Sequence, residues 1–274
     1  MTDLADVIPE NNIIILAPHY ADTVLTFGGY LDALFKSGRL AKKFIRVVQI
    51  FSRSNYRVRD HEGNRNTSLP RVQFATGVRL LEELECLDAL ISHGHYNYEL
   101  KAERECVVRL KAWKPGEQME FPQGNQSTFD EEEQRIFTQL KKYAREWLAH
   151  SNTAVLVPLG VKEHVDHVLL RDAVFAARHI LLGKAKATLY LGEDQPYTGL
   201  ASDEDWHVAK AFMAQHRLEP LTYEIDAKRK ARLVEKHYPS QYEEIYREGV
   251  LHRADELAKE MKESVPLERM YRIL

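Results

Sequence analysis

The sequence predicts an α/β fold built on a mostly parallel β-sheet flanked by helices. Short runs rich in Ile and Val show no strict alternation of polar and apolar residues, which is typical of strands buried on both faces. The segments between these runs carry apolar residues at helical spacing. Strands and helices that alternate along a chain favour parallel strands joined by right-handed crossovers, so ligands are expected at the carboxyl ends of the strands.

The first unit of this pattern is a strand, a helix and a second strand. Residues 13–17 and 44–51 are the two apolar runs. The apolar residues at helical spacing between them are Val24, Phe27, Leu31, Leu34 and Phe35. Gly38 stands where a helix commonly ends, and the pair Gly28-Gly29 allows this helix to lie close to the sheet or to a ligand.

The alternation continues through the rest of the chain. Residues 52–70 and 114–126 are rich in polar residues, Gly or Pro and are predicted to be loops. Thr128 and Glu131 have the spacing of a capping box that starts a helix reaching His150. The other predicted elements are strands at 154–158, 188–191 and 222–225 and helices at 72–90, 168–182 and, with a break at 238–240, 227–262.

Composition limits the kind of protein. A chain of 274 residues with 44% apolar residues can bury a large core, and we expect a single domain over residues 1–274. The formal net charge of −3 gives no basic surface of the kind that binds nucleic acid or an anionic membrane. Cys86 and Cys106 are too few for a disulfide framework. Residues 1–12 lack the features of a secretory signal and no apolar run approaches ~20 residues, so a cytoplasmic location is expected.

Clusters of imidazoles and carboxylates follow two of the predicted strands. His19 and Asp22 come after the strand at 13–17, and His167 comes after the strand at 154–158. Two imidazoles and one carboxylate suit a divalent metal, most often zinc, and leave a coordination position open for water. Either cluster alone is more often a hydrogen-bonded surface turn. Because both follow strand ends, a shared metal site is favoured.

With these motifs the chain resembles the LmbE-like or PIG-L family of metal-dependent N-deacetylases. The family motifs PHxDD, Gly-Gly and HxDH correspond to PHYAD at 18–22, Gly28-Gly29 and HVDH at 164–167. The further matching stretches are 158–161, 169–173, 193–197 and 238–241, so the similarity covers most of the chain. The most similar branch includes deacetylases of glycopeptide-antibiotic sugars. The resemblance implies a Rossmann-like sheet with the LmbE-like fold.

The resemblance also implies a role for each matched residue. His19, Asp22 and His167 would bind one zinc ion per chain, although another divalent first-row metal fits the same ligands. His164 would stabilise the developing oxyanion and pass a proton to the leaving amine. Asp166, between the two histidines of the second motif, would orient one of the imidazoles.

Ala21 departs from the family pattern, which has an aspartate general base at this position. Zinc lowers the pKa of a bound water molecule to ~7. Loss of a general base, in turn, removes ~10²–10⁴ in rate. Three explanations stay open from the sequence: a substitution in an otherwise ordinary enzyme, a different base such as Glu163 or Asp166, or a protein that has given up catalysis.

The function predicted from these residues is a zinc-dependent hydrolase that removes an N-acyl group, first of all acetyl. The open metal position beside a histidine acid indicates the reaction class. The resemblance alone indicates the substrate, an amino sugar such as N-acetylglucosamine or a sugar conjugate. The alternative is a catalytically silent protein that keeps the metal and binds a sugar-like ligand. No dinucleotide is expected, because Gly28-Gly29 lacks the third glycine of that fingerprint. An oligomer is compatible with the sequence.

Other polar residues have simpler interpretations. His93 and His95 flank Gly94 and indicate a turn. Arg79 with Glu82 and Glu83 has the spacing of a solvated ion pair on a helix. Some charged residues could either line the site or only face solvent. They are Arg53, Arg57, Arg59, Glu193 and Asp194.

Overall fold

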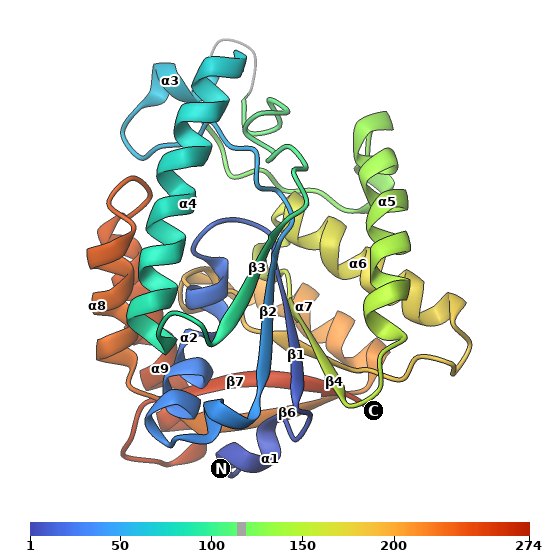
Figure 1. The fold of residues 1–274 in the computed structure, drawn as a ribbon, viewed down its shortest axis with the longest axis vertical. Coiled ribbons are helices and arrows are strands. Elements are labelled where there is room, and N and C mark those ends of the chain that lie inside the picture. The colour runs from blue at the N-terminus through green and yellow to red at the C-terminus, as the bar shows by residue number, and fades with distance from the viewer. Residues whose placement is uncertain (114–118) are drawn as a thin grey trace.

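The computed structural model describes residues 1–113 and 119–274, and within them a seven-stranded sheet forms the centre of the molecule (Figure 1). The strand order is β3-β2-β1-β4-β5-β7-β6. The strands are β1 Asn12–Ala17, β2 Phe44–Gln49, β3 Tyr96–Leu100, β4 Thr153–Pro158, β5 Thr188–Gly192, β6 Leu218–Glu224 and β7 Leu267–Ile273. All pairings from β3 to β5 are parallel, whereas β7 is antiparallel to both of its neighbours. The predicted α/β class with a mostly parallel sheet is confirmed.

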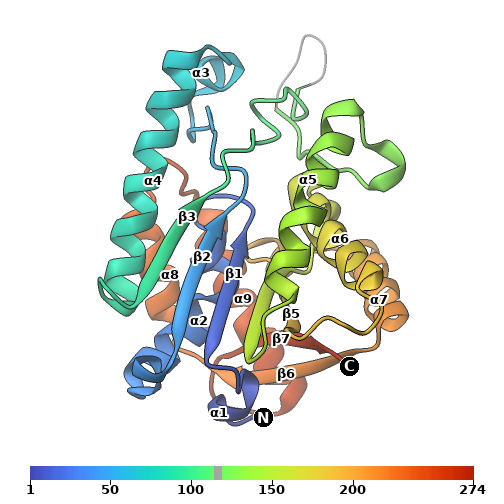
Figure 2. The same cartoon turned by 45° about the vertical axis from the view of Figure 1, so that its right-hand side comes forward.

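Helices cover both faces of the sheet. The helices of the described residues are α1 Leu4–Val7, α2 Asp22–Lys36, α3 His61–Arg65, α4 Leu69–Ile91, α5 Glu131–Leu148, α6 Val165–Ile180, α7 Asp203–His216, α8 Ala227–His237 and α9 Glu244–Met261. Figure 2 shows α4 and α8 on one side of the sheet and α5, α6 and α7 on the other. A sheet covered in this way has no face open to water, so its strands need no polar face.

Successive residues of β1 point into opposite cores. Ile13 and Ile15 are buried in one core together with Phe27 of α2. Ile14 and Leu16 are buried in the other core, to which α5 and α6 contribute. This arrangement explains why the strand reads as a continuous apolar run rather than as an alternating one.

β1 and β4 lie side by side, which brings the two sequence motifs to the same edge of the sheet. Ile13 pairs with Ala154 and Ile15 with Leu156 in a parallel register. From β1 the chain continues outward to β2, and from β4 it continues to β5 on the other side. The order of strands therefore reverses between β1 and β4, the place where open α/β sheets commonly bind ligands.

Two strands were missing from the sequence-based prediction. β3 is an edge strand whose residues are exposed or half-buried, so it lacks the apolar run that marks the buried strands, and its alternating sequence YNYEL spans only five residues. β7 is inserted between β5 and β6 and is mostly buried, although its sequence LERMYRI contains three charged residues. One of them, Glu268, is buried in an ion pair with Lys230 of α8. A buried charge that has a distant partner looks like a surface residue in the sequence.

The predicted capping box of Thr128 and Glu131 is wrong. Asp130 caps α5, and its carboxylate accepts a hydrogen bond from the backbone N–H of Glu133 at 2.9 Å, while the Glu133 carboxylate accepts one from the backbone N–H of Asp130 at 3.0 Å. The pair Thr128/Glu131 and the pair Asp130/Glu133 both have the spacing of a capping box. Only the second pair has a tertiary contact, because the Asp130 carboxylate also pairs with Lys111 at 2.6 Å. That contact favours the second pattern.

The other predicted boundaries need smaller corrections. α6 begins at Val165 rather than at residue 168, and the loop predicted at 52–70 contains the short helix α3 and the first residues of α4. Of the loop predicted at 114–126, residues 114–118 lie outside the described residues. Within the described part of the chain, none of the helices combines the length and apolarity needed to cross a bilayer.

Candidate metal centre and active site

The two motifs meet at the carboxyl ends of β1 and β4. His19 lies in the turn after β1, and Asp22 is the first residue of α2. His164 is the residue that caps α6, and His167 lies in the first turn of that helix. Since the two strands are parallel neighbours, their following turns face one another, and the structure brings residues 19 and 167 into contact.

Three donor atoms from His19, Asp22 and His167 form a nearly equilateral triangle. The Asp22 Oδ2 atom lies 3.2 Å from His19 Nδ1 and 3.2 Å from His167 Nε2, and the two nitrogens are 3.3 Å apart. Ligand atoms bound to zinc at ~2.0–2.2 Å with tetrahedral angles lie about 3.3–3.6 Å from one another. The three side chains are buried, and their donor set fits a zinc ion or another divalent first-row metal.

Each histidine of the triangle is held by a carboxylate on its second ring nitrogen. His19 Nε2 lies 2.8 Å from Asp166 Oδ2, and His167 Nδ1 lies 3.1 Å from Asp194 Oδ1. Asp194 is itself fixed, because its other oxygen accepts backbone N–H groups of Gly160 and Val161 at 2.6 and 2.7 Å. Such carboxylates orient metal-binding imidazoles and set which nitrogen is free to bind.

Asp166 is completely engaged by its neighbours. Its Oδ1 accepts a hydrogen bond from the Arg109 guanidinium at 2.6 Å, and its Oδ2 accepts the backbone N–H of Cys106 at 2.9 Å besides meeting the His19 ring. Burial raises the pKa of Asp166, but Arg109 and His19 outweigh burial and hold that pKa far below its usual range. Both oxygens are occupied, which suits an orienting role and argues against Asp166 as a general base.

The carboxylates around the triangle favour positively charged imidazoles. Burial lowers the pKa of His19, but its hydrogen bonds to Asp166 and Asp22 outweigh burial and raise it to about 9. Burial likewise lowers the pKa of His167, which Asp22 and Asp194 raise to about 10. A metal ion must therefore displace protons from both rings, because only a deprotonated nitrogen can bind it.

Zinc binding near pH 7.5 is expected to release about two protons per ion, since the pKa values of His19 and His167 both lie above that pH. The apparent affinity for zinc should accordingly rise with pH as the pH approaches those values. Titration calorimetry in buffers of different ionisation enthalpy measures the released protons. A His167→Ala variant, which loses one corner of the triangle, serves as the control. A binding heat that does not depend on the buffer would contradict this expectation.

His164 presents a proton to the cavity. Its Nδ1 accepts the backbone N–H of Asp166 at 3.3 Å, so the proton of the neutral ring is on Nε2. Nε2 faces Cys106 Sγ at 3.7 Å. Burial and the positive charges of His19 and His167 hold the pKa of His164 well below its usual value. His164 is thus suited to donate a hydrogen bond through Nε2.

Ala21 has a strained backbone at the start of α2. Its φ of 79° and ψ of −21° lie in the left-handed region, which alanine adopts less readily than Gly, Asn or Asp. Its backbone N–H donates to Glu83 Oε2 at 2.7 Å, and the hydroxyl of Tyr238 donates to the same oxygen at 2.8 Å. Glu83 on α4 therefore fixes the turn that separates His19 from Asp22.

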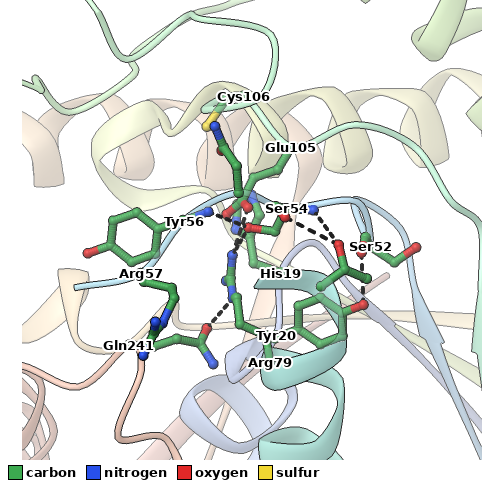
Figure 3. A network of polar contacts seen from close by, with 12 residues as sticks. His19, Tyr20, Ser52, Ser54, Tyr56, Arg57, Arg79, Glu105, Cys106 and Gln241 are labelled. Atoms are coloured by element: carbon green, nitrogen blue, oxygen red, sulfur yellow. Dashed lines mark hydrogen bonds and ion pairs between the residues drawn. The ribbon is translucent and has the colours of Figure 1, made fainter. Parts of the chain in front are cut away.

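The predicted solvated ion pair of Arg79 with Glu82 and Glu83 is wrong. All three side chains are buried, and Figure 3 shows Arg79 reaching Gln241 on one side and Glu105 at its tip. Arg79 Nε donates to Gln241 Oε1 at 2.8 Å, and its Nη1 lies 2.7 Å from Glu105 Oε2. The sequence could not reveal this burial, because these partners lie on other segments that pack against α4.

A cavity of about 230 Å³ opens beside the triangle. Its wall includes His19, Ala21, Asp22 and His164. The other residues that matter for its shape and polarity are Tyr56, Arg79, Glu105, Cys106, Phe121, Tyr197 and Tyr246. Tyr197 falls in the stretch 193–197 that follows β5, and this position after a strand end was the sequence signal for it. Glu105 and Cys106 carry no such signal, because they follow the edge strand β3.

The remaining candidates divide between the site and the surface. Asp194 supports His167, whereas Glu193 pairs with Arg253 at 2.6 Å and with the Tyr271 hydroxyl at 2.9 Å. Among the described residues, Glu163 is not part of the cavity wall. The same holds for Arg53, Arg57, Arg59, His93, His95 and Asp166. The side chain of His93 is 90% exposed, as expected for a turn.

Solved structures of known proteins share this fold. The zinc-inhibited form of teicoplanin deacetylase is 17% identical, with a TM-score of 0.68 over 96% of this chain and 98% of that chain. N,N'-diacetylchitobiose deacetylase from Pyrococcus horikoshii is 13% identical, with a TM-score of 0.56 over 99% and 90% of the two chains. The 4-carboxy-2-hydroxymuconate hydratase of Pseudomonas putida is 14% identical, with a TM-score of 0.53 over 96% of each chain.

The likeness shows that the chain has the fold of these deacetylases, as the resemblance in the motifs predicted. The hydratase carries a different reaction on the same fold, so the fold alone does not determine the reaction. No known protein-family model matches the sequence, and neither does any curated protein.

Proposed function

We propose that this protein is a metal-dependent hydrolase that removes an N-acyl group, foremost acetyl, from an amino sugar or a glycoconjugate. The observation that carries the proposal is the triangle of His19 Nδ1, Asp22 Oδ2 and His167 Nε2, which opens into the cavity next to His164. The similar folds of a teicoplanin deacetylase and a diacetylchitobiose deacetylase support the same reaction class.

The chemistry divides between the metal and the side chains. When bound, a zinc ion supplies a Lewis acid and lowers the pKa of a coordinated water molecule to ~7. His164 directs its Nε2 proton into the cavity, where it can stabilise negative charge on a carbonyl oxygen. Once the ring has taken up a second proton, it would pass one to the departing amine. Asp166 and Asp194 keep the other two imidazoles in the orientation that binding requires.

The cavity wall is compatible with a sugar. Tyr56, Phe121, Tyr197 and Tyr246 offer aromatic surfaces that can pack against the apolar face of a sugar ring. Polar groups that converge on a mostly apolar cavity fix the orientation of a bound ligand. N-acetylglucosamine and its conjugates are therefore the substrates to test first.

Ala21 favours a second candidate, a protein that binds the metal and a sugar-like ligand without turnover. Ala21 lies in the cavity wall, and its methyl group cannot accept a proton. The sequence offered Asp166 and Glu163 as substitute bases. Both oxygens of Asp166 are engaged, and Glu163 is not among the described residues that line the cavity. A slow enzyme and a silent binding protein therefore remain the alternatives for the experiment to separate.

Zinc-loaded protein incubated with N-acetylglucosamine conjugates is expected to release acetate, which a coupled assay measures. A chelator should abolish the release and added zinc should restore it, because the triangle holds the ion on which the proposed reaction depends. A His164→Gln variant should bind zinc normally but lose most of the rate, since it keeps the triangle and loses the proton donor. Binding of the conjugate without acetate release, in this protein and in an Ala21→Asp variant, would identify the silent alternative.

A further inference from the structure

A second pair of metal-binding atoms faces the same cavity. Cys106 follows β3, and its sulfur lies 3.7 Å from Nε2 of His164, which caps α6. Both residues contribute to the cavity wall, and the thiol is chemically distinct from the three donors of the triangle. The proposed deacetylation does not use this thiol.

The distance between these two atoms suits a shared ion. Zinc–sulfur bonds of ~2.3 Å and zinc–nitrogen bonds of ~2.0–2.1 Å at a tetrahedral angle place the two donors about 3.6 Å apart. Asp166 and His19 also lie close to this pair, within 4.8 Å of both donors. Their facing atoms, however, are 2.8 Å from each other, and the guanidinium of Arg109 already holds Asp166. Cys106 and His164 are therefore the two donors available on the cavity side, with water completing the coordination.

We propose that Cys106 and His164 form a thiophilic cation site that takes a soft divalent ion such as Cd²⁺ or a second Zn²⁺. Thiolate and imidazole together select such ions over Mg²⁺ and Ca²⁺. The ion bonds to the sulfur and to Nε2 of His164, the thiol proton passes to solvent, and the imidazole proton moves from Nε2 to Nδ1, which then gives up its hydrogen bond from the backbone N–H of Asp166. No oxidant or reductant takes part.

Occupation of this site has a functional consequence that rests on the proposed function. An ion on His164 Nε2 removes the hydrogen-bond donor that faces the cavity, and its positive charge lies beside the triangle. Soft cations should therefore inhibit the zinc-loaded enzyme. Inhibition through this site should require Cys106. Inhibition by displacement of zinc from the triangle should not require it.

Cadmium titration of the zinc-loaded protein tests the site without an activity assay. A cadmium–thiolate bond gives a charge-transfer band in the ultraviolet, which cadmium bound to His19, Asp22 and His167 cannot give. Cys86 supplies the matched control, because it is also buried but lies on α4, where its thiol faces the backbone carbonyl of Leu233 at 3.9 Å. The variants to compare are Cys106→Ser, Cys86→Ser and His164→Gln.

The wild-type protein and Cys86→Ser should show the band with one thiolate per ion, and Cys106→Ser should lose it. His164→Gln should keep the thiolate but bind cadmium at least about tenfold more weakly, since loss of even an orienting partner of a metal ligand costs ~10–100-fold. No band in the wild-type protein, or a band that persists in Cys106→Ser, would overturn the site. These outcomes are independent of acetate release, so they are distinguishable from a failure of the proposed function.

Discussion

Replacing Ala21 by aspartate is expected to raise kcat for acetate release by ~10²–10⁴, the range that a general base contributes. The three donors of the triangle are unchanged by this substitution, so zinc affinity should stay close to that of the wild-type protein. Ala21 lies in the cavity wall and stands between His19 and Asp22 in the sequence, so a carboxylate there is expected to reach the space in front of the donors. Steady-state kinetics and zinc titration of both proteins test the prediction.

The backbone at position 21 favours the same substitution. Asparagine and aspartate tolerate the left-handed conformation better than alanine, for which it costs roughly 1–2 kcal/mol. Ala21→Asn is therefore the matched control, because it has the size and conformational preference of aspartate but cannot accept a proton. We expect this variant to keep the wild-type rate. Equal gains in both variants would attribute the effect to the backbone rather than to a base.

The pH profile of Ala21→Asp should gain an acidic limb. The new carboxylate acts only when ionised; the negative charge of Asp22 raises its pKa, whereas the positive charge of the bound zinc ion lowers it. Glu83 also lies next to position 21, and burial raises the pKa of Glu83 to about 7. The rate should therefore fall on acidification as this carboxylate takes up a proton. If the wild-type protein already turns over quickly and Ala21→Asp leaves the rate unchanged, another residue is the base.

Replacing Lys230 by methionine is expected to lower the free energy of unfolding by about 3–5 kcal/mol. Lys230 forms a fully buried ion pair with Glu268 and donates to Gln195 Oε1 at 2.9 Å. Burial lowers the pKa of Lys230, and the charge of Glu268 opposes that effect. Methionine fills a similar volume but leaves the Glu268 carboxylate buried without its cation. Urea denaturation followed by circular dichroism measures the loss.

A double variant separates the lost partner from the lost packing. In Lys230→Met/Glu268→Gln the buried charge is gone, and the glutamine oxygen can still accept from Tyr30 N–H and from the Tyr223 hydroxyl, which lie 3.1 and 2.9 Å from Glu268 Oε2. Compared with Lys230→Met, the double variant should regain about 2 kcal/mol or more of the free energy of unfolding. If the free energy of unfolding of Lys230→Met is less than about 1 kcal/mol below that of the wild type, water or a neighbouring group compensates the buried charge of Glu268.

The sequence determined the framework of the fold because periodicity is a local property. Continuous apolar runs at β1 and β4 indicated strands buried on both faces, and helical spacing indicated α2 between strands. The position of polar clusters after strand ends also indicated which residues meet. His19, Asp22 and His167 could be predicted as neighbours because parallel strands carry their following turns to one edge of a sheet.

The tertiary structure decided what depends on partners distant in sequence. β7 enters the sheet antiparallel, with Glu268 buried against Lys230. Arg79 is buried, because Gln241 and Glu105 come to it from other segments. Cys106 reaches His164 for the same reason. A charged or polar side chain has the same local pattern whether it faces water or a buried partner, and only the packing of the whole chain determines which of the two it meets.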